Sequence, residues 1–397
     1  MHQSLFTYLP QILAIPAKKG HSYNMMIYLD YASRTPPSEA ALDAFVQAEK
    51  RFIGNPMSAH NIGREAGQEL SRITSGIAEL LQVKYHEIIF TSGATEANNL
   101  AIKGIARAYG YHGRHILSTC LEHPSVSGVL ANLQENGYEI ELLKILPDGT
   151  IDLAHLEAAI RPDTILVCVS AVDSELGAIQ PLSAISRMAA KHPHCHLHID
   201  AAQAMGKLPV DMSGASTISI SPHKFYGLSG SGVLIKRECV VLEPLIHGGA
   251  GTTIYRSGTP VLGLASSCYA ALDVAFANQD CWLEKVSRLR DYLLINLARY
   301  PKVRINSPAN GSPYILNLSV IGVKAPKFTA ELDKHGVCVS IKSACSTDTA
   351  PSRPVMAVSR DKQNALCSWR VSLSHLTEIW ELDAFLSAFD HCYKLLT

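Results

Sequence analysis

The residues best suited to chemistry in this chain surround Lys224, in the run SISPHK at 219–224. Small and hydroxyl-bearing residues precede this lysine, and the apolar run GVLI follows at 232–235. A lysine amine forms a Schiff base only when it is neutral, and burial or neighbouring cations lower its pKa. Hydroxyls and an imidazole beside it can bind a phosphate. The run therefore suits a Schiff base with pyridoxal phosphate (PLP), although a surface lysine in a Ser/Gly loop fits the same pattern.

A second candidate site lies earlier in the chain. The apolar run IIF at 88–90 leads into the small-residue segment TSGATEANN at 91–99. A strand, a tight turn and a helix in this order leave backbone N–H groups free at the helix N-terminus, where an anion binds. A generic strand–helix turn has the same pattern, so the segment favours an anion site without requiring one.

The elements that position these residues alternate between strands and helices. Each expected strand ends in polar residues, and helical stretches such as the one from about 64 to 81 intervene; the strands are expected at 88–90, 116–118, 164–169 and 197–200. This alternation predicts an α/β fold with a largely parallel sheet, whose functional groups gather at the carboxyl ends of the strands.

The pattern changes after Pro260, where helices and strands no longer alternate regularly. The expected elements are helices at about 262–278 and 283–298, strands at 314–319, 337–340 and 369–373, an irregular loop at 341–354, and an amphipathic helix from 377. We therefore predict an N-terminal extension (1–27), a large domain (28–261) and a smaller α+β domain (262–397).

Composition excludes several classes of function. Lys+Arg and Asp+Glu number 35 each among 397 residues, so no net charge attracts nucleic acid or an anionic membrane. No apolar run reaches the length of a membrane span. The 10 cysteines are scattered without paired spacing, and residues 1–27 lack the features of a signal or transit peptide. We expect a cytoplasmic protein with reduced thiols. The segment HPHCHLH at 192–198 suits a turn and a strand, and we expect no metal there.

Taken together, the motifs resemble those of the cysteine desulfurases, which are fold-type I, class V aminotransferase-like PLP enzymes. The resemblance extends from about Ile27 to the C-terminal helix. It rests on nine segments in family order: YLDYA at 28–32, GNPMSAH at 54–60, TSGATEANNLAIKG at 91–104, LEHPSV at 121–126, HIDAAQAMGKLPVD at 198–211, SPHKFYG at 221–227, RSGTP at 256–260, SAC at 343–345 and WRVSLSHLT at 369–377.

This resemblance implies roles for individual cofactor-binding residues. Lys224 would hold PLP and move protons at the substrate's Cα, while Asp200 would pair with the pyridine nitrogen and keep it protonated. Gln203 would donate to the ring oxygen, near Ser174, and His123 would stack on the ring. Without the resemblance, Asp200 is equally consistent with a helix-capping aspartate and His123 with a core histidine. The phosphate would be bound by Ala94, Thr95, Ser221 and His223, and by Thr259 of the neighbouring subunit.

The resemblance also implies how substrate would bind and react. Arg370 would hold the substrate carboxylate, for which a bidentate guanidinium is the fitting group. Cys345, in a loop rich in Ser, Thr and Pro, would attack the substrate sulfur as a thiolate, leaving alanine and a persulfide. Cys120, Cys168 and Cys338 lie in apolar contexts and are expected to be core residues.

Three positions depart from the family pattern. Ser174 stands where family members commonly have asparagine, GGAGTT at 248–253 replaces a Gly-Gly-Gly-Gln-Glu-Arg segment, and Lys342 replaces a glycine. The main hypothesis is a homodimeric, PLP-dependent cysteine desulfurase that passes sulfur from L-cysteine to an acceptor protein. Two alternatives are another class V enzyme, such as an aminotransferase or a sulfur or selenium amino-acid lyase, and a catalytically weakened partner in a sulfur-transfer complex. The acceptor's pathway, whether iron–sulfur assembly, tRNA thiolation or DNA sulfur modification, stays open.

Overall fold

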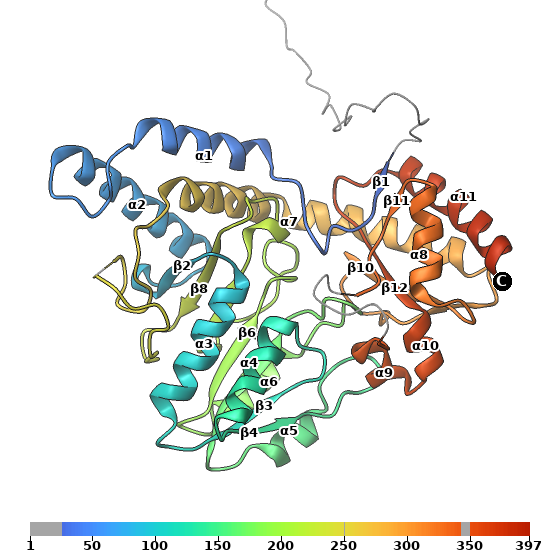
Figure 1. Cartoon of the computed structure of the whole chain (residues 1–397), viewed down its shortest axis with the longest axis horizontal. Coiled ribbons are helices and arrows are strands. Elements are labelled where there is room, and N and C mark those ends of the chain that lie inside the picture. The colour runs from blue at the N-terminus through green and yellow to red at the C-terminus, as the bar shows by residue number, and fades with distance from the viewer. Residues whose placement is uncertain (1–25, 250, 343–349) are drawn as a thin grey trace, which may run out of the picture.

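The computed structural model describes residues 26–249, 251–342 and 350–397. Two sheets form the centres of its two parts, the larger built mainly from the first 260 residues (Figure 1). The larger sheet has seven strands in the order β2-β8-β7-β6-β5-β3-β4. Their bounds are β2 Ile88–Thr91, β3 His115–Ser118, β4 Glu139–Leu142, β5 Thr164–Ser170, β6 His196–Asp200, β7 Thr217–Ile220 and β8 Gly232–Lys236.

The large sheet is mostly parallel, which confirms the predicted α/β fold. Strands β4, β3, β5, β6 and β7 run parallel, and only β8 is antiparallel to its neighbours β7 and β2. Asp200, the last residue of β6, lies in register with Ser219 of β7. This register brings the carboxylate predicted to bind the cofactor to the same sheet edge as the lysine that follows β7.

Helices cover both faces of this sheet, and four of the six described next begin at a side-chain cap. Ser38 accepts a hydrogen bond from the Ala41 N–H at the start of α1, and His60 Nδ1 accepts one from Gly63 at the start of α2. The helix predicted from about 64 therefore begins earlier, at Asn61. The bounds are α1 Glu39–Arg51, α2 Asn61–Leu80, α3 Ala94–Tyr109, α4 Pro124–Glu135, α5 Leu153–Ala159 and α6 Leu182–Ala189.

One long helix, α7 (Leu262–Leu297), replaces the two helices predicted over 262–298. The residues between 278 and 283 include neither glycine nor proline, so the hydrogen-bond ladder continues through them. Helices α1 and α2 pack along α7 and support it (Figure 1). Within the described residues, neither α7 nor any other helix is apolar over a length that would cross a membrane.

The smaller part is built around an antiparallel three-stranded sheet, β12-β10-β9. Its strands are β9 Val303–Ile305, β10 Ile315–Val320 and β12 Ser368–Ser372, and its helices are α8 Ala325–Lys334, α9 Arg353–Ser359, α10 Lys362–Cys367 and α11 Ile379–Leu396. The short strand β1 (Ile27–Tyr28) pairs with β11 (Val337–Cys338) of this part. Residues 27–28 therefore lie against the C-terminal half, while the domain boundaries predicted from sequence stay a prediction.

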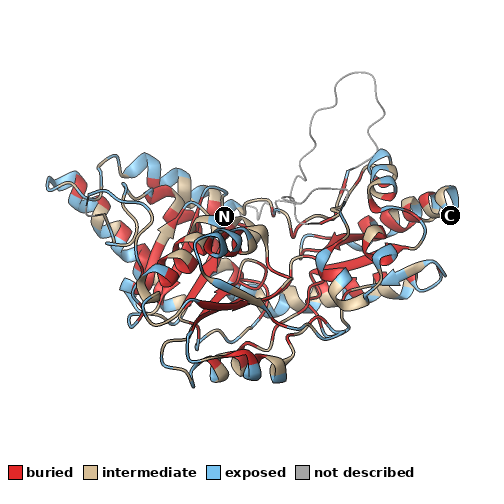
Figure 2. Ribbon diagram, turned by 60° about the horizontal axis from the view of Figure 1, so that its bottom comes forward, coloured by how far each residue is buried: buried red, intermediate tan, exposed pale blue. Residues whose placement is uncertain are grey.

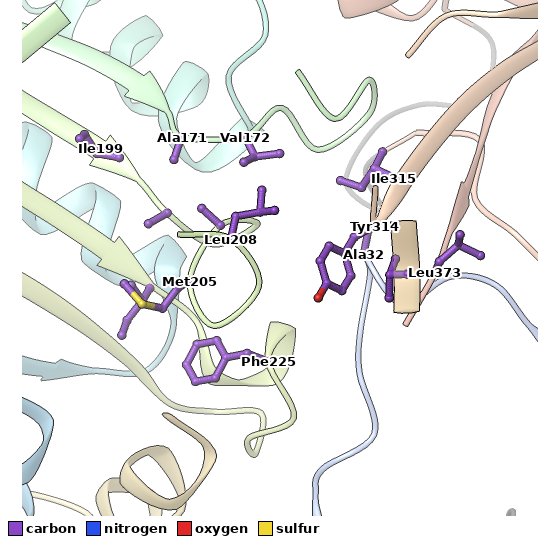
Figure 3. Packing of buried hydrophobic residues seen from close by; sticks show 14 of the residues in the cluster. Ala32, Ala171, Val172, Ile199, Met205, Leu208, Phe225, Tyr314, Ile315 and Leu373 are labelled. Carbon is purple, nitrogen blue, oxygen red and sulfur yellow. The ribbon is translucent and has the colours of Figure 1, made fainter. Parts of the chain in front are cut away.

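A continuous hydrophobic core joins the two parts. Buried residues fill both sheets (Figure 2). Where the parts meet, Ile199 and Phe225 belong to the same apolar cluster as Tyr314, Ile315 and Leu373 of the smaller part (Figure 3). Because close-packed interiors resist displacement, this shared core fixes β12 relative to the carboxyl ends of β6 and β7.

Candidate active site

A cavity of about 400 Å³ lies at the carboxyl ends of the parallel strands and reaches β12 of the smaller part. Among the described residues, it brings together most of the predicted site residues: Ala94, Thr95, His123, Ser174, Asp200, Gln203, Ser221, His223, Lys224 and Arg370. Thr259 does not line it. Cys345 lies outside the described residues.

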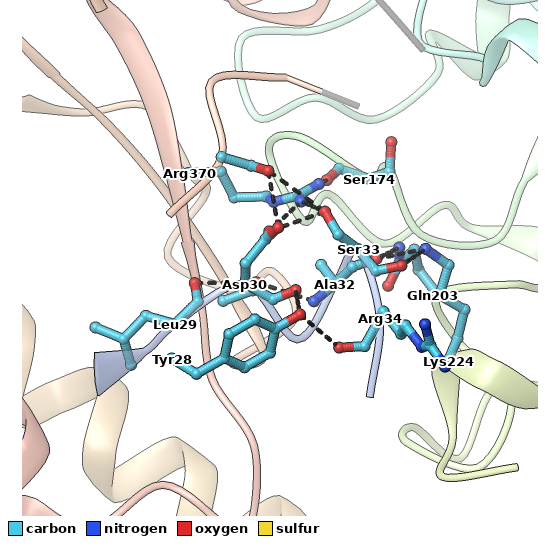
Figure 4. Close-up of polar contacts among 12 residues, drawn as sticks. Tyr28, Leu29, Asp30, Ala32, Ser33, Arg34, Ser174, Gln203, Lys224 and Arg370 are labelled. Atoms are coloured by element: carbon cyan, nitrogen blue, oxygen red, sulfur yellow. Dashed lines mark hydrogen bonds and ion pairs between the residues drawn. The ribbon is translucent and has the colours of Figure 1, made fainter. Parts of the chain in front are cut away.

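Lys224 is held in place by the turn that follows β7. Pro222–Lys224 form a 3₁₀ turn, and Tyr226 next to it has the left-handed φ of 68°. Two contacts maintain that backbone: the Tyr226 N–H donates to Thr35 Oγ1 over 2.8 Å, and its hydroxyl lies 2.6 Å from Ser374 Oγ. Lys224 Nζ donates to the carbonyl oxygens of Ala32 (2.8 Å) and Ser33 (2.5 Å), as Figure 4 shows.

The carboxylate of Asp200 and the amide of Gln203 are both fixed by hydrogen bonds. Asp200 Oδ1 accepts from the Ala202 N–H over 2.9 Å. Gln203 Nε2 donates to the Ala32 carbonyl over 2.8 Å, and its Oε1 accepts from Lys207 Nζ over 3.1 Å. Burial, with the nearby Lys224 and Arg370 cations, lowers the pKa of Lys207 to about 7. One hydrogen of Gln203 Nε2 and one lone pair of its Oε1 are thus used within the protein.

His123 lines the cavity from the start of α4. Its Nδ1 accepts the Ser125 backbone N–H over 3.1 Å, so the ring itself caps the helix. Burial lowers the pKa of His123; among nearby charges, Asp200 opposes this effect and Lys224 adds to it. The ring is therefore well placed to lie against a planar group beside Asp200.

The other end of the cavity suits a phosphate. The first turn of α3, including Ala94 and Thr95, has no side-chain cap among the described residues and lines the cavity. Gly232 allows this turn to approach β8, because a Cβ there would meet the Gly93 carbonyl carbon at 2.5 Å. Ser221 Oγ lies 3.0 Å from His223 Nδ1, and burial together with the Lys224 cation lowers the pKa of His223 to about 4.

Arg370 lies at the edge of the cavity in the fully buried strand β12 and is itself only 1% exposed. Its Nη2 donates to Asp30 Oδ1 (2.8 Å) and Ser33 Oγ (2.7 Å), and its Nη1 donates to the Ser174 carbonyl (2.7 Å), as Figure 4 shows. Asp30 Oδ2 also accepts from Ser340 Oγ over 3.0 Å. The guanidinium is thus held in a fixed orientation, with its charge partly balanced by Asp30.

The segment predicted to serve a neighbouring subunit lies beside the phosphate end of the cavity. Arg256 Nε pairs with Glu96 Oε1 at 2.9 Å, in the first turn of α3. Thr259 is exposed. Its predicted contact with a neighbour's phosphate stays a prediction.

The three cysteines predicted to be core residues differ in burial. Cys168 is buried, whereas Cys120 and Cys338 are only partly buried. Burial is the main cause that raises the pKa of each thiol, so all three are poor candidates for a thiolate. None lines the described part of the cavity. In the part of the chain that the structure covers, no cluster of three or more His, Cys, Asp or Glu side chains is arranged to hold a metal.

The sequence assigned no role to three polar residues beside the site, of which Asn98 and Glu122 are buried and Asp30 is partly buried. Asp30 pairs with Arg370, Asn98 donates to Asp200 over 2.8 Å, and Glu122 accepts hydroxyls of Thr119 and Ser170, each over 2.7 Å. Burial raises the pKa of Glu122 to about 7. All three stand inside motifs quoted from the sequence, but spacing alone does not say which motif side chains face the site.

Comparisons with known proteins agree with this geometry. The model of the family "Aminotransferase class-V" matches residues 27–385. The chain is 35% identical to cysteine desulfurase IscS of Dictyoglomus turgidum, over 93% of this chain and 95% of that protein. Among solved structures, it is similar to a NifS-like protein (TM-score 0.88, 28% identity, covering 94% of this chain and 100% of that one). It is also similar to SspA in complex with cysteine (TM-score 0.77, 29% identity, 87% and 98%).

Proposed function

The chain belongs to the class-V aminotransferase family, and from this premise we propose that it is a cysteine desulfurase. It would convert L-cysteine to L-alanine and pass the sulfur, as a persulfide on Cys345, to an acceptor protein. The observation that carries the proposal is that Lys224 and Arg370, from different parts of the fold, line one cavity. An amine for the cofactor and a guanidinium for a carboxylate thus flank a space suited to an amino acid.

The residues present fit pyridoxal phosphate. Lys224 would bind it, Asp200 and Gln203 would contact its ring, and the first turn of α3 with Ser221 and His223 would bind its phosphate. Hydrogen bonds within the protein hold the side chains of Asp200, Gln203 and His223 in place, which supports this assignment. When bound, the cofactor supplies an electron sink that stabilises negative charge at the substrate's Cα.

The protein's own groups orient the substrate and move its protons. Arg370 binds the carboxylate, and its contacts with Asp30 and the Ser174 carbonyl set the direction from which the substrate enters. The amine of Lys224, which would hold the cofactor, would also carry the proton to and from the substrate's Cα. The carbonyls of Ala32 and Ser33 that now accept from Nζ hold that amine in place.

Cys345 would complete the sulfur transfer. Its thiolate attacks the substrate sulfur, so that the C–S bond breaks while an S–S bond forms. The electron pair of the C–S bond stays on carbon, which is protonated to give alanine. Carbon is thereby reduced, and the two sulfur atoms together are oxidised by two electrons as they form the persulfide. Because the Cys120, Cys168 and Cys338 thiols have raised pKa values, they do not compete for this role.

Assembly and location follow from the same proposal. We propose a homodimer in which Thr259 of one subunit reaches the phosphate bound by the other. Its support is a set of exposed apolar side chains around this segment and the α1–α2 connection: Ile53, Met57, Ile254 and Val261. A persulfide needs reduced thiols, which favours the cytoplasm as the location.

The variant Cys345→Ser tests the proposal. We expect it to keep the yellow colour of bound PLP and to bind cysteine, because Lys224, Asp200 and Arg370 are unchanged. Alanine release should collapse, since a serine hydroxyl is far less ionised than a thiol and is a poor nucleophile toward sulfur. The matched control Cys338→Ser should release alanine at the wild-type rate. Wild-type turnover by Cys345→Ser would instead point to a lyase.

A further inference from the structure

Asn98, in α3, lies at the centre of a buried hydrogen-bond network behind the cavity. Its side chain is fully buried, and both the nitrogen and the oxygen of its amide form hydrogen bonds. Nδ2 donates to Asp200 Oδ2 (2.8 Å) and to Ser125 Oγ (2.9 Å). Oδ1 accepts from the hydroxyl of Ser219 and lies 3.0 Å from His198 Nε2. The amide therefore uses all four of its hydrogen-bonding positions.

The neighbours of this amide fix the direction of every hydrogen bond in the network. Asp200 accepts the Ala202 N–H with its other oxygen, so a carboxylate here requires a donor, and Asn98 must turn Nδ2 toward it. Ser125 Oγ, which accepts from the same Nδ2, then has its own hydrogen free for His123 Nδ1, 2.8 Å away. On the opposite side, His198 donates through Nε2, and its Nδ1 accepts from Thr217 Oγ1, 2.9 Å away.

His123 receives two donors on one ring nitrogen. Both the Ser125 hydroxyl and the Ser125 backbone N–H (3.1 Å) point at Nδ1, which therefore has to be unprotonated. The proton of the neutral ring is then on Nε2, the nitrogen that remains for a molecule in the cavity. The lowered pKa of His123, caused mainly by burial, agrees with a neutral ring.

We propose that Asn98 is a positioning residue that sets the proton arrangement of the site. It holds Asp200 as a hydrogen-bond acceptor and, through Ser125, holds His123 with its proton on Nε2. Since a neutral ring protonated at Nε2 offers a donor and no base to the cavity, proton abstraction at the substrate is left to Lys224. This division of roles rests on the proposed function, whereas the network itself does not.

Nuclear magnetic resonance of the full-length chain, with its histidines labelled with ¹⁵N, tests the proposal before and after PLP is added. We expect the neutral His123 ring to be protonated on Nε2 in both forms. In Asn98→Asp the new carboxyl faces Asp200, so the two acids share one proton. The new oxygen then offers only a lone pair to Ser125, so the Ser125 hydroxyl turns to it and no longer donates to Nδ1. This should raise the pKa of His123 by about 1 or more.

Two further variants separate the hydrogen-bond relay from simple charge. Asn132→Asp makes the same substitution, with a full negative charge, at an exposed position of the helix that begins at His123 and should leave the His123 titration unchanged. In Asn98→Asp combined with Ser125→Ala the rise should shrink, because no Ser125 oxygen is left to accept a hydrogen bond from a protonated Nδ1. The other charged groups that face His123 are Asp200 and Lys224, and neither is substituted in any of these variants.

Several outcomes would overturn the proposal. A wild-type ring protonated on Nδ1 would refute it, as would an unchanged His123 pKa in Asn98→Asp or an equal rise with Ser125→Ala present. If Asn98→Asp does not fold, two measurements still test the proposal. One is the tautomer of the His123 ring in the wild type, and the other is the His123 pKa in Ser125→Ala alone, for which we expect a smaller rise. Loss of alanine release alone would be a result about the proposed function and would not contradict the inference about Asn98.

Discussion

Replacing the buried acid Glu122 should change how the stability of the protein depends on pH. Its carboxyl is 3% exposed, accepts hydroxyls of Thr119 and Ser170, and has a pKa raised by burial to about 7 from an ordinary 4.5. Between these values the folded protein keeps a proton that the unfolded chain releases. The contribution of Glu122 to the free energy of unfolding is therefore fully present below about pH 4.5 and is lost as the pH rises to about 7.

The magnitude follows from the difference between the two values. One pKa unit is worth about 1.4 kcal/mol, so the wild type loses about 3 kcal/mol from this group across that range. The variant Glu122→Gln resembles the protonated acid and cannot lose a proton. Relative to the wild type, it should therefore gain about 3 kcal/mol of unfolding free energy between pH 4.5 and pH 8.

Urea unfolding of both proteins at pH 4.5 and pH 8 measures this difference. Glu157→Gln is a control of opposite sign, because the hydrogen bond from Lys191 lowers the pKa of the exposed Glu157. It should lose a small amount of stability at the higher pH. If Glu122→Gln differed from the wild type by the same free energy at both pH values, the burial argument for Glu122 would be refuted.

Three further predictions concern the site. Lys224→Ala should fold, by circular dichroism, but lose the yellow colour of the bound cofactor; a variant that stayed yellow would contradict the assignment. Arg370→Lys should keep the colour and raise the KM for cysteine about tenfold or more, because an ammonium cannot hold Asp30 and a carboxylate in bidentate geometry; an unchanged KM would count against Arg370. By light scattering we expect a dimer, and the exposed Ile254→Asp should weaken both dimerisation and PLP affinity; a monomer with full PLP occupancy would contradict shared sites.

Much of the fold could be predicted because local pattern and tertiary structure agree. The strands predicted at 88–90, 116–118, 164–169 and 197–200 all form within a residue or two of their predicted bounds. Prediction was wrong for α7, which was expected as two helices but continues through 278–283, where neither glycine nor proline interrupts the hydrogen-bond ladder. It also missed the pairing of β1 with β11, because partners about 310 residues apart leave no local signal.

The candidate site, too, could be predicted from the sequence only in part. Lys224, Asp200 and Arg370 could be named because their chemistry and their motifs point to one function, and the structure places them around one cavity. Asn98 and Glu122 carry no such signal. An asparagine in a helix and a glutamate before a histidine gain meaning only when the fold buries them beside Asp200 and Ser170.

Mass spectrometry of the wild-type protein incubated with L-cysteine, without reductant or acceptor, tests the central proposal most directly. We predict one added sulfur atom on the peptide that contains Cys345 and none on the peptides with Cys120 or Cys338, whose thiols have raised pKa values. Added sulfur on another cysteine, or alanine formation with no persulfide on Cys345, would contradict the proposal.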